Sequence, residues 1–477
     1  MIHEKADKLL KVLKDYAPDH GRSDWERLET ILSANVKSKF GQEHAFNQID
    51  SIEAYRASVS VRDYQGLEPW ILPSLQGEHG VLTTEAIVAF ERTSGSTGEG
   101  KWIPYTERLR MDFASALNDW LAGVARHFPE ALAGKAYWAL SPRFDTSPTL
   151  SHGACIESDG DYFPQDVGQA LMDWLVMPSS VNQEDSVNHF FERTLDALLA
   201  EPELSFISVW SPTFFLELDH RLKQRGLEYT SWKNIWPKLA FISCWADAGS
   251  ARWLTMVRER SGVFIEPKGL LSTEGVISIP GGASRVPRLF RGGHFIEFVC
   301  SKSGRVFCRD ELVVGTVYSI VLTTSGGLYR YQTGDLVEVT GIPESDAIEV
   351  RFMGREGIVS DLVGEKLDER FVANVFRLAE VSGFLAVSEG LNEYTLWLPN
   401  SDSGQQVIER LRENVYMAQA LDLGQLRPIR VRPLADGWEG RYVNHIAGLQ
   451  GCRVGDVKLP ILLANPLSEE LAQCLTT

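Results

Sequence analysis

The sequence lacks features that mark several classes of protein. Its six cysteines are scattered and include no Cys-x-x-Cys pair, so neither a zinc site nor a disulfide framework is indicated. No run of about 18 apolar residues occurs, which excludes a membrane-spanning helix. Lys and Arg form no cluster, and 47 basic against 64 acidic residues give a net charge of −17, so the chain would repel nucleic acid. We therefore expect a cytoplasmic protein whose partners include neither a membrane nor a nucleic acid.

The composition that is present is that of a folded enzyme. A chain of 477 residues is too long for one ordinary hydrophobic core, so two or three domains are expected. Its 13 Trp, 13 Tyr and 22 Phe supply enough apolar surface to exclude intrinsic disorder. The first twenty residues form a charged amphipathic pattern and lack the apolar stretch of a signal peptide.

The middle of the chain alternates between two hydrophobic periods. Buried strands are predicted at 204–210, 239–244 and 263–265, with helical patterns between them. This alternation is typical of a parallel sheet covered by helices. After residue 290 the pattern changes, and residues 318–324 and 328–333 predict an antiparallel hairpin.

The pattern resets after Gly354-Arg355. The C-terminal residues predict a compact α+β unit with a helix near 368–381, strands at 384–388 and 394–398, a helix at about 403–420 and a strand near 429–432. The chain is therefore predicted to be an α/β protein. Its large N-terminal domain, 1–354, would have helix-covered sheets, and its smaller C-terminal domain, 355–477, would be α+β.

The most informative segment is Glu91-Arg-Thr-Ser-Gly-Ser-Thr-Gly-Glu-Gly-Lys101-Trp-Ile-Pro-Tyr-Thr106. Small residues let a backbone curl around a phosphate, hydroxyls and N–H groups donate to its oxygens, and a lysine offsets its charge. A Walker A loop would need Ser or Thr where Trp102 stands, and Pro104 would break the helix that should come after it. A phosphate loop of another kind is favoured, with a flexible linker as the alternative.

This string closely resembles the phosphate loop of the GH3 branch of the adenylate-forming enzymes, the acyl-acid amido synthetases. The resemblance implies an adenylate-forming enzyme architecture and a bacterial-type member of the branch. It also implies that a run of loop residues binds the phosphates of ATP and that the lysine after them acts in catalysis. These residues are Thr93, Ser94, Gly95, Ser96, Thr97, Gly98 and Lys101.

Leu271-Ser-Thr-Glu-Gly275 comes after the third predicted strand and resembles a second motif of the family. The resemblance implies that Ser272 or Thr273 touches the acyl phosphate and that Glu274 helps to hold Mg²⁺, a cation that prefers oxygen ligands. From the residues alone, a Thr-Glu pair at the end of a strand is more often a helix cap.

Leu328-Tyr-Arg-Tyr-Gln-Thr-Gly-Asp335-Leu-Val is the strongest match. It resembles the Tyr-x-Thr-Gly-Asp motif, in which the aspartate accepts hydrogen bonds from the ribose hydroxyls. The Tyr-Arg-Tyr segment is typical of the GH3 branch. It implies that Tyr329 and Arg330 also contact the nucleotide, with Arg330 near the phosphates, and that Arg355 is a second ribose contact. From the residues alone, Asp335 can also be a turn aspartate.

Two further segments resemble parts of the mobile small domain. Asp361-Leu-Val-Gly-Glu-Lys-Leu-Asp-Glu369 resembles the entry to that domain, which implies a hinge. Gly455-Asp-Val-Lys458-Leu-Pro460 resembles the region of the lysine that bridges carboxylate and phosphate during adenylation. The family usually has arginine after that proline, where this chain has Ile461, and a surface role for Lys458 stays open.

The resemblance implies an ATP- and Mg²⁺-dependent ligase. It would activate a carboxylic acid as an acyl-adenylate, release pyrophosphate, and transfer the acyl group to an amine. The expected amine is an amino acid. An acyl-CoA ligase, a carrier-protein loader and a regulator without turnover are the alternatives. No histidine in a motif identifies a general base. Candidates for an apolar acyl pocket, or for ordinary core, are Phe113, Leu117, Trp120, Tyr137, Trp138 and 210–213.

Overall fold

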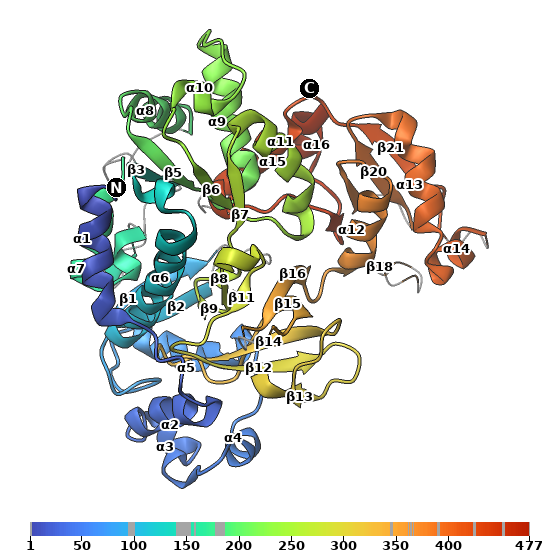
Figure 1. The fold of residues 1–477 in the computed structure, drawn as a ribbon. Helices are drawn as coiled ribbons and strands as arrows, with labels where there is room; N and C mark the ends of the chain where they lie inside the picture. Colours follow the sequence, from blue (N-terminus) through green and yellow to red (C-terminus); the bar gives the residue numbers. More distant parts are fainter. Residues whose placement is uncertain are drawn as a thin grey trace.

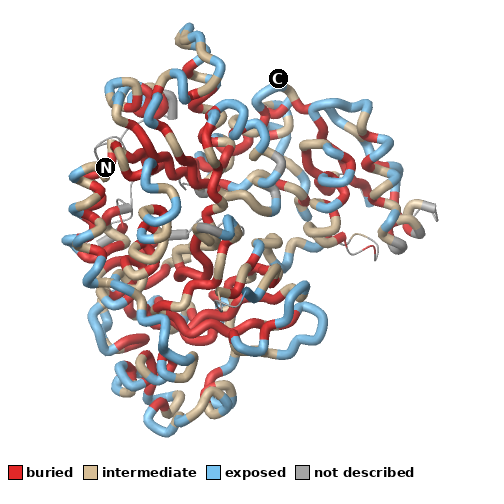
Figure 2. The backbone as a smooth tube through the Cα atoms, viewed as in Figure 1, coloured by how far each residue is buried: buried red, intermediate tan, exposed pale blue. Residues whose placement is uncertain are grey.

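The structure is a computed structural model of the 477-residue chain. It describes residues 2–93, 101–139, 154–156, 159–176, 187–343, 347–360, 362, 365, 367–388, 392–422, 426–450 and 454–476. Figure 1 shows a large body, coloured blue to yellow, with the C-terminal elements in orange and red beside it. The strands of the sheets are largely buried, and exposed residues lie mainly on the outer sides of helices and on loops (Figure 2). None of the helices in the described ranges is long and apolar enough to cross a bilayer.

A four-stranded parallel sheet of order β3-β5-β6-β7 confirms the strands predicted between 204 and 265. Alternate residues of its strands face opposite ways: Ile207 and Ile242 join one hydrophobic cluster, while Phe206 and Phe241 join another. Helices therefore cover both faces, as parallel sheets require. The strands are β3 Lys135–Trp138, β5 Leu204–Ser208, β6 Phe241–Cys244 and β7 Phe264–Pro267, and the helices packed around them include α8 Val187–Leu199, α9 Pro212–Gln224, α10 Trp232–Ile235 and α11 Leu254–Ser261.

A seven-stranded antiparallel sheet of order β10-β11-β16-β15-β14-β12-β13 forms the second part of the large body. The predicted hairpin is confirmed, because β14 pairs with β15 antiparallel. Helices α2 Asp24–Ala34, α3 Lys39–Glu43 and α4 Ile52–Ser58 lie below this sheet in the view of Figure 1. The strands are β10 Ser278–Ile279, β11 Arg288–Leu289, β12 Phe295–Cys300, β13 Val306–Phe307, β14 Val317–Thr323, β15 Tyr331–Gly341 and β16 Glu349–Arg355.

A small sheet and a short hairpin complete the large body. Strand β1 pairs antiparallel with β2 and parallel with β4, and β8 pairs antiparallel with β9. The strands are β1 Ile87–Thr93, β2 Lys101–Thr106, β4 Ala154–Cys155, β8 Leu271–Ser272 and β9 Gly275–Val276. The remaining helices are α1 Glu4–Leu13, α2 Asp24–Ala34, α3 Lys39–Glu43, α4 Ile52–Ser58, α5 Tyr64–Leu75, α6 Glu107–His127 and α7 Gln165–Trp174.

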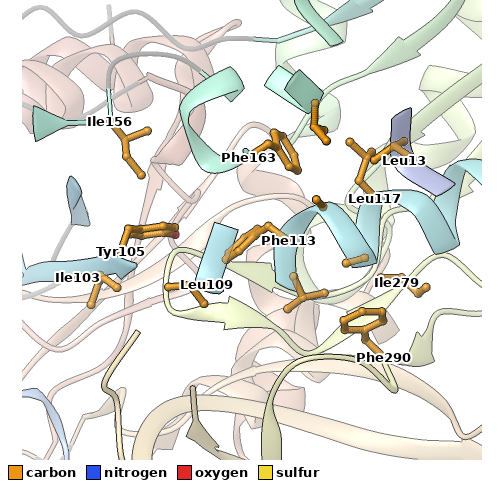
Figure 3. Packing of buried hydrophobic residues seen from close by; sticks show 14 of the residues in the cluster. Leu13, Ile103, Tyr105, Leu109, Phe113, Leu117, Ile156, Phe163, Ile279 and Phe290 are labelled. Atoms are coloured by element: carbon orange, nitrogen blue, oxygen red, sulfur yellow. The ribbon is translucent and has the colours of Figure 1, made fainter. Parts of the chain in front are cut away.

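Helix α6 is central to the core of the large body. Thr106, the last residue of β2, caps the helix by accepting a hydrogen bond from the Leu109 backbone N–H at 3.2 Å. Phe113 and Leu117 of this helix lie among apolar side chains from other elements, including Phe163 and Leu13 (Figure 3). This cap joins the end of β2 directly to the start of α6.

The C-terminal elements form a four-stranded sheet of order β21-β20-β19-β22 and a short β17-β18 hairpin. Leu385 and Leu396 face one hydrophobic cluster of this sheet, and Phe384 and Trp397 face another. The elements are β17 Val359–Ser360, β18 Leu367–Asp368, α12 Glu369–Leu378, β19 Phe384–Val387, β20 Tyr394–Leu398, α13 Gly404–Leu411, α14 Val415–Asp422, β21 Arg430–Pro433, α15 Trp438–Gln450, β22 Leu462–Leu463 and α16 Glu469–Thr476. The two clusters draw their buried residues from Leu367 onward, and the division of the chain at 354/355 remains a prediction.

The single helix predicted over 403–420 is wrong as a continuous element. Helix α13 ends at Leu411, and α14 begins at Val415. The Asn414 side chain accepts a hydrogen bond from the Met417 backbone N–H at 3.0 Å, so it caps the second helix. An asparagine inside a helical pattern can offer the backbone this alternative bond, which explains the break.

A buried ion pair holds the turn that leads into β15. Arg330, at φ 49°, donates from Nε and Nη2 to the carboxylate of Glu297 on β12, at 2.8 and 3.2 Å. Its Nη1 donates to the carbonyls of Arg56 and Val59, at 3.2 and 2.8 Å. Arg56 of α4 also donates to Glu297, at 2.8 Å. Glu297 is fully buried on β12, and its carboxylate binds one arginine from α4 and one from the turn before β15. This one side chain therefore links the three segments.

Replacing Glu297 by Ala should lower the free energy of unfolding by about 3–5 kcal/mol, because it leaves two guanidinium groups without their carboxylate, one of them buried. Urea unfolding followed by circular dichroism measures the loss. The control is Glu78→Ala, which removes a solvent-exposed pair with Lys39 and should cost less than about 1 kcal/mol. Similar losses of unfolding free energy in the two variants would contradict the proposed dependence of stability on the Glu297 ion pairs.

Candidate functional site

Three segments that are distant in sequence meet around the hydroxyl of Tyr331. Lys101, the first residue of β2, places its ammonium 3.4 Å from that hydroxyl and 5.8 Å from the centre of the Tyr64 ring. Glu274 places Oε1 3.3 Å from the same hydroxyl. The lysine of the glycine-rich segment and the glutamate of the second motif therefore both lie next to one phenol hydroxyl.

Thr273 and Glu274 form the turn between β8 and β9, where Ser272 pairs with Gly275. The pair therefore lies in a β-hairpin, and the helix-cap alternative is wrong. The Thr273 hydroxyl donates to Glu274 Oε2 at 3.0 Å, and the Ser272 hydroxyl donates to the Gly275 carbonyl at 3.2 Å. The Glu274 side chain is buried and is held from two sides.

Asp335 and Arg355 are cross-strand partners of β15 and β16. Arg355 Nε donates to Asp335 Oδ1 at 2.9 Å, and Arg355 Nη2 donates to the Thr333 carbonyl at 3.2 Å. The charge of Asp335 raises the pKa of Arg355, and burial opposes this shift. Because Asp335 lies inside β15 and is buried, the turn-aspartate alternative is wrong.

Lys458 lies over the same site, although it is more than a hundred residues away in sequence. Its ammonium is 5.6 Å from the Trp245 ring and 5.1 Å from the Phe352 ring. Its side chain is exposed to solvent, yet desolvation by the surrounding protein lowers the pKa of its ammonium group. The carboxylates of Asp335, Glu369 and Glu274 oppose this shift, and Arg355 adds to it. The tertiary structure thus brings Lys458 within electrostatic reach of both motifs.

Two residues predicted to contact the nucleotide lie in the core instead. Tyr329 is fully buried, donates to the Leu82 carbonyl at 2.8 Å and stacks on Phe40 with ring centres 4.6 Å apart. Arg330 commits four of its five N–H groups to Glu297 and to backbone carbonyls. A guanidinium so engaged is a scaffold for the site rather than a phosphate ligand, and these two assignments are corrected accordingly.

The rest of the predicted phosphate loop lies outside the described residues: Ser94, Gly95, Ser96, Thr97 and Gly98. Thr93 is the last residue of β1, and its backbone is paired with that of Lys101. Tyr331 is the site residue that sequence reasoning missed. Its position in the Tyr-Arg-Tyr segment was the available signal, but nothing in the sequence says which of the two tyrosines faces Lys101.

An aromatic cluster lies at the carboxyl ends of β3, β5 and β7. The buried Lys268 ammonium is 5.4, 6.0 and 4.6 Å from the ring centres of Trp120, Trp138 and Trp210, and it donates to the Ser208 hydroxyl. These three tryptophans were among the predicted acyl-pocket residues. Ligands of open α/β sheets bind at such carboxyl ends.

The aromatic cluster and the Lys458 site are linked through one ring pair. Trp210 and Trp245 have ring centres 6.0 Å apart, and Lys458 lies on the Trp245 ring. The other candidates, Phe113, Leu117 and Tyr137, lie in the buried clusters. Trp210 is therefore the member of the predicted set that is linked to the Lys458 site.

Glu266, at the end of β7, lies beside this aromatic cluster. Its Oε2 accepts a hydrogen bond from Trp120 Nε1 at 2.8 Å. Burial raises its pKa to about 8, while the Trp120 bond and the charge of Lys268 oppose the shift. The folded chain therefore retains a proton on this carboxyl at a pH where an unfolded chain would release it.

The fold is one that adenylate-forming enzymes share. The structure superposes on 2-hydroxyisobutyryl-CoA ligase in the postadenylation state with a TM-score of 0.57 and 11% identity, over 94% of this chain and 90% of the other. It superposes on the GH3.15 acyl acid amido synthetase with a TM-score of 0.81 and 18% identity, over 98% and 95% of the two chains.

Sequence comparison identifies the family within that class. The GH3 family N-terminal domain matches residues 9–231, and the GH3 family central domain matches residues 288–355. The indole-3-acetic acid-amido synthetase GH3.4 of Arabidopsis thaliana is 36% identical, over 81% of this chain and 76% of its own. The jasmonoyl–L-amino acid synthetase JAR6 of Nicotiana attenuata is 22% identical, over 100% and 97%. The chain belongs to the GH3 family.

Family membership carries an activity. The chain is a ligase of the acyl acid amido synthetase type, which activates a carboxylic acid with ATP as an acyl-adenylate and transfers the acyl group to an amine. These two relatives are plant proteins, so they give no support to the narrower expectation of a bacterial-type member.

The raised pKa of Glu266 predicts a pH-dependent effect on stability. Between about pH 5 and 8 the unfolded chain ionises this carboxyl and the folded chain does not, so wild-type stability falls as pH rises. Glu266→Gln lacks this titration. Its stability relative to wild type should rise by up to about 1.4 kcal/mol per pH unit over that range and level off above it.

Urea unfolding at pH 5, 6.5, 8 and 9 measures this difference. Glu203→Gln, which changes an exposed carboxylate paired with Lys238, is the control for the loss of a surface carboxylate. A difference between Glu266→Gln and wild type that does not vary with pH would contradict the assignment.

Proposed function

We propose that this chain joins a small carboxylic acid with an apolar, planar body to an amino acid, and that it uses ATP and Mg²⁺. The observation that carries the proposal is the meeting of Lys101, Glu274 and Tyr331 next to the Asp335–Arg355 pair, with Lys458 over both. Three of these groups are cations, which suits a site where phosphates and a carboxylate must come together.

The chemistry explains why cations are needed. A carboxylate is a poor acyl donor, because its leaving group would be oxide. Attack of a carboxylate oxygen on the α-phosphorus of ATP forms the acyl-adenylate and expels pyrophosphate, and AMP is then a good leaving group. Lys101 and Lys458 would stabilise negative charge on the phosphates, and the Thr273 hydroxyl would donate to the acyl phosphate. The residues 93–98 would bind phosphate oxygens beside Lys101.

The Asp335–Arg355 pair would bind the ribose. Asp335 Oδ1 accepts from Arg355, which orients the carboxylate, and Oδ2 is the oxygen that we assign to the ribose hydroxyls. The buried strand position of Asp335 favours this role, since a fixed acceptor needs no reordering when the nucleotide binds.

The residues around Glu274 fit a Mg²⁺ site shared with the nucleotide. Within the described ranges no three His, Cys, Asp or Glu side chains gather as a metal cluster. Mg²⁺ commonly binds one or two protein carboxylates together with substrate phosphates and water. Glu274, oriented by Thr273 and Tyr331, is the protein carboxylate that we assign to it. When bound there, Mg²⁺ would neutralise charge on the phosphate oxygens.

The aromatic cluster suggests the class of acid. Trp120, Trp138 and Trp210 supply flat apolar surfaces next to the adenylation site. Acids named for similar proteins are indole-3-acetic acid, jasmonate and, in a solved GH3.15 complex, 2,4-DB. An amino acid is the proposed acceptor, and CoA or the arm of a carrier protein is the alternative.

We further propose that residues 355–477 rotate relative to 1–354 between the two half-reactions. The position of Lys458 near Asp335 and Glu274 supports this proposal, because adenylation would need a cation there. Amide formation would occur after Lys458 has moved away, so that the amine can reach the acyl carbon.

The test of the function is release of pyrophosphate from ATP and Mg²⁺ across a panel of aryl, indolyl and aliphatic acids, with hydroxylamine to trap the activated acyl group. We expect pyrophosphate and a hydroxamate with an aromatic acid, and an amide when an amino acid replaces hydroxylamine. Product formation with CoA but with no amino acid would favour the alternative acceptor. ADP and phosphate as products would contradict adenylation.

Lys458→Ala should slow adenylation about 100-fold or more, because it removes a positive charge from the developing transition state. The same variant should convert a chemically prepared acyl-adenylate and amino acid at close to the wild-type rate. Rapid-quench assays of the two half-reactions measure both rates. Lys302→Ala, an exposed lysine in the turn after β12, is the control. Unchanged adenylation would return Lys458 to the surface role.

A further inference from the structure

Tyr331 stands between two opposite charges that do not touch each other. Its hydroxyl accepts from the Lys101 ammonium at 3.4 Å and donates to Glu274 Oε1 at 3.3 Å. Lys101 and Glu274 are both described residues, and they form no direct ion pair. Both contacts with the hydroxyl are longer than a typical hydrogen bond.

The position of the hydroxyl is set by the backbone on both sides of Tyr331. The residue pairs with Leu322 of β14 on one side and forms a bridge with Arg62 on the other. Arg330, immediately before it, is held by Glu297. The ring is fully buried in the core cluster. Tyr331 therefore cannot move far to follow either charged neighbour.

An ammonium and a carboxylate this near to each other attract strongly when water is scarce. In direct contact they would neutralise each other, and a nucleotide would have to separate them before binding. A phenol satisfies both groups with one hydroxyl. It leaves two N–H groups of the lysine and most acceptor sites of the carboxylate for a ligand.

We propose that Tyr331 is a positioning residue for adenylation, whose hydroxyl holds Lys101 and Glu274 apart so that one stays available to phosphate and the other to Mg²⁺. This inference rests on the proposed function. It assigns a role that the motif itself does not specify, because the nucleotide contact of the motif is its aspartate.

One further observation agrees with a donor role for the hydroxyl. Thr273 occupies the other carboxylate oxygen at 3.0 Å, which leaves Oε1 to face the phenol.

The experiment compares Tyr331→Phe with Tyr318→Phe. Tyr318 is an equally buried tyrosine of the same sheet, and its hydroxyl accepts from the Val313 N–H at 3.0 Å, away from the site. Each Phe variant keeps the ring and its packing, and thermal unfolding checks that both remain folded. Pyrophosphate release is measured as a function of Mg²⁺ concentration, and the second half-reaction is measured with a chemically prepared acyl-adenylate.

For Tyr331→Phe we expect the Mg²⁺ concentration for half-maximal rate to rise about tenfold, the loss of roughly one hydrogen bond to a charged group. The rate of the second half-reaction should stay within about twofold of wild type, because pyrophosphate has already left. Tyr318→Phe should change neither quantity. In a Glu274→Gln background, Tyr331→Phe should add little, since the two changes act on one interaction.

Equal Mg²⁺ titrations for the two Phe variants would overturn the inference. So would an equal loss of both half-reactions in Tyr331→Phe, which indicates general damage, or full additivity with Glu274→Gln. The proposed function fails separately, if wild-type protein releases no pyrophosphate with any acid of the panel.

Discussion

The buried contact between Arg330 and Glu297 is the constraint on which the candidate site depends. It fixes a residue with positive φ at the turn before β15, and it ties that turn to β12 and to the end of α4. The residues after the turn, Tyr331 and Asp335, are the ones that face Lys101, Glu274 and Arg355. A carboxylate buried on a strand is costly unless it is paired, and here its pairing sets the position of the site.

From that fixed strand the site gathers charge from separate parts of the chain. Lys101 comes from the start of β2, Glu274 from a two-residue turn, and Lys458 from the C-terminal elements. The first two are held by side chains of the large body, whereas Lys458 rests on two aromatic rings. Contacts of this last kind are weak, which suits the proposed movement of Lys458 away from the site between the two half-reactions.

Much of the fold was predictable, because strands such as Leu204–Ser208 and Phe241–Cys244 carry continuous apolar runs and the hairpin from 317 to 341 has a glycine turn. The motifs containing Lys101 and Glu274 were also predictable, because phosphate and Mg²⁺ chemistry calls for those residue types. The role of Arg330 was not. An arginine beside a nucleotide motif suits a phosphate, and only the folded chain shows that Glu297, thirty-three residues earlier, already holds its guanidinium.

The sequence by itself determined the class of the protein, because the segments around Lys101, Glu274 and Asp335 are local motifs that resemble those of the adenylate-forming enzymes. The tertiary structure alone decided which neighbouring side chains face the site. Successive residues of a strand point to opposite faces, yet the irregular turn before β15 changes that alternation. Tyr329 therefore lies in the core, and Tyr331 lies between Lys101 and Glu274. Contacts across hundreds of residues, such as that of Lys458 with Trp245, depend on packing that no local pattern encodes.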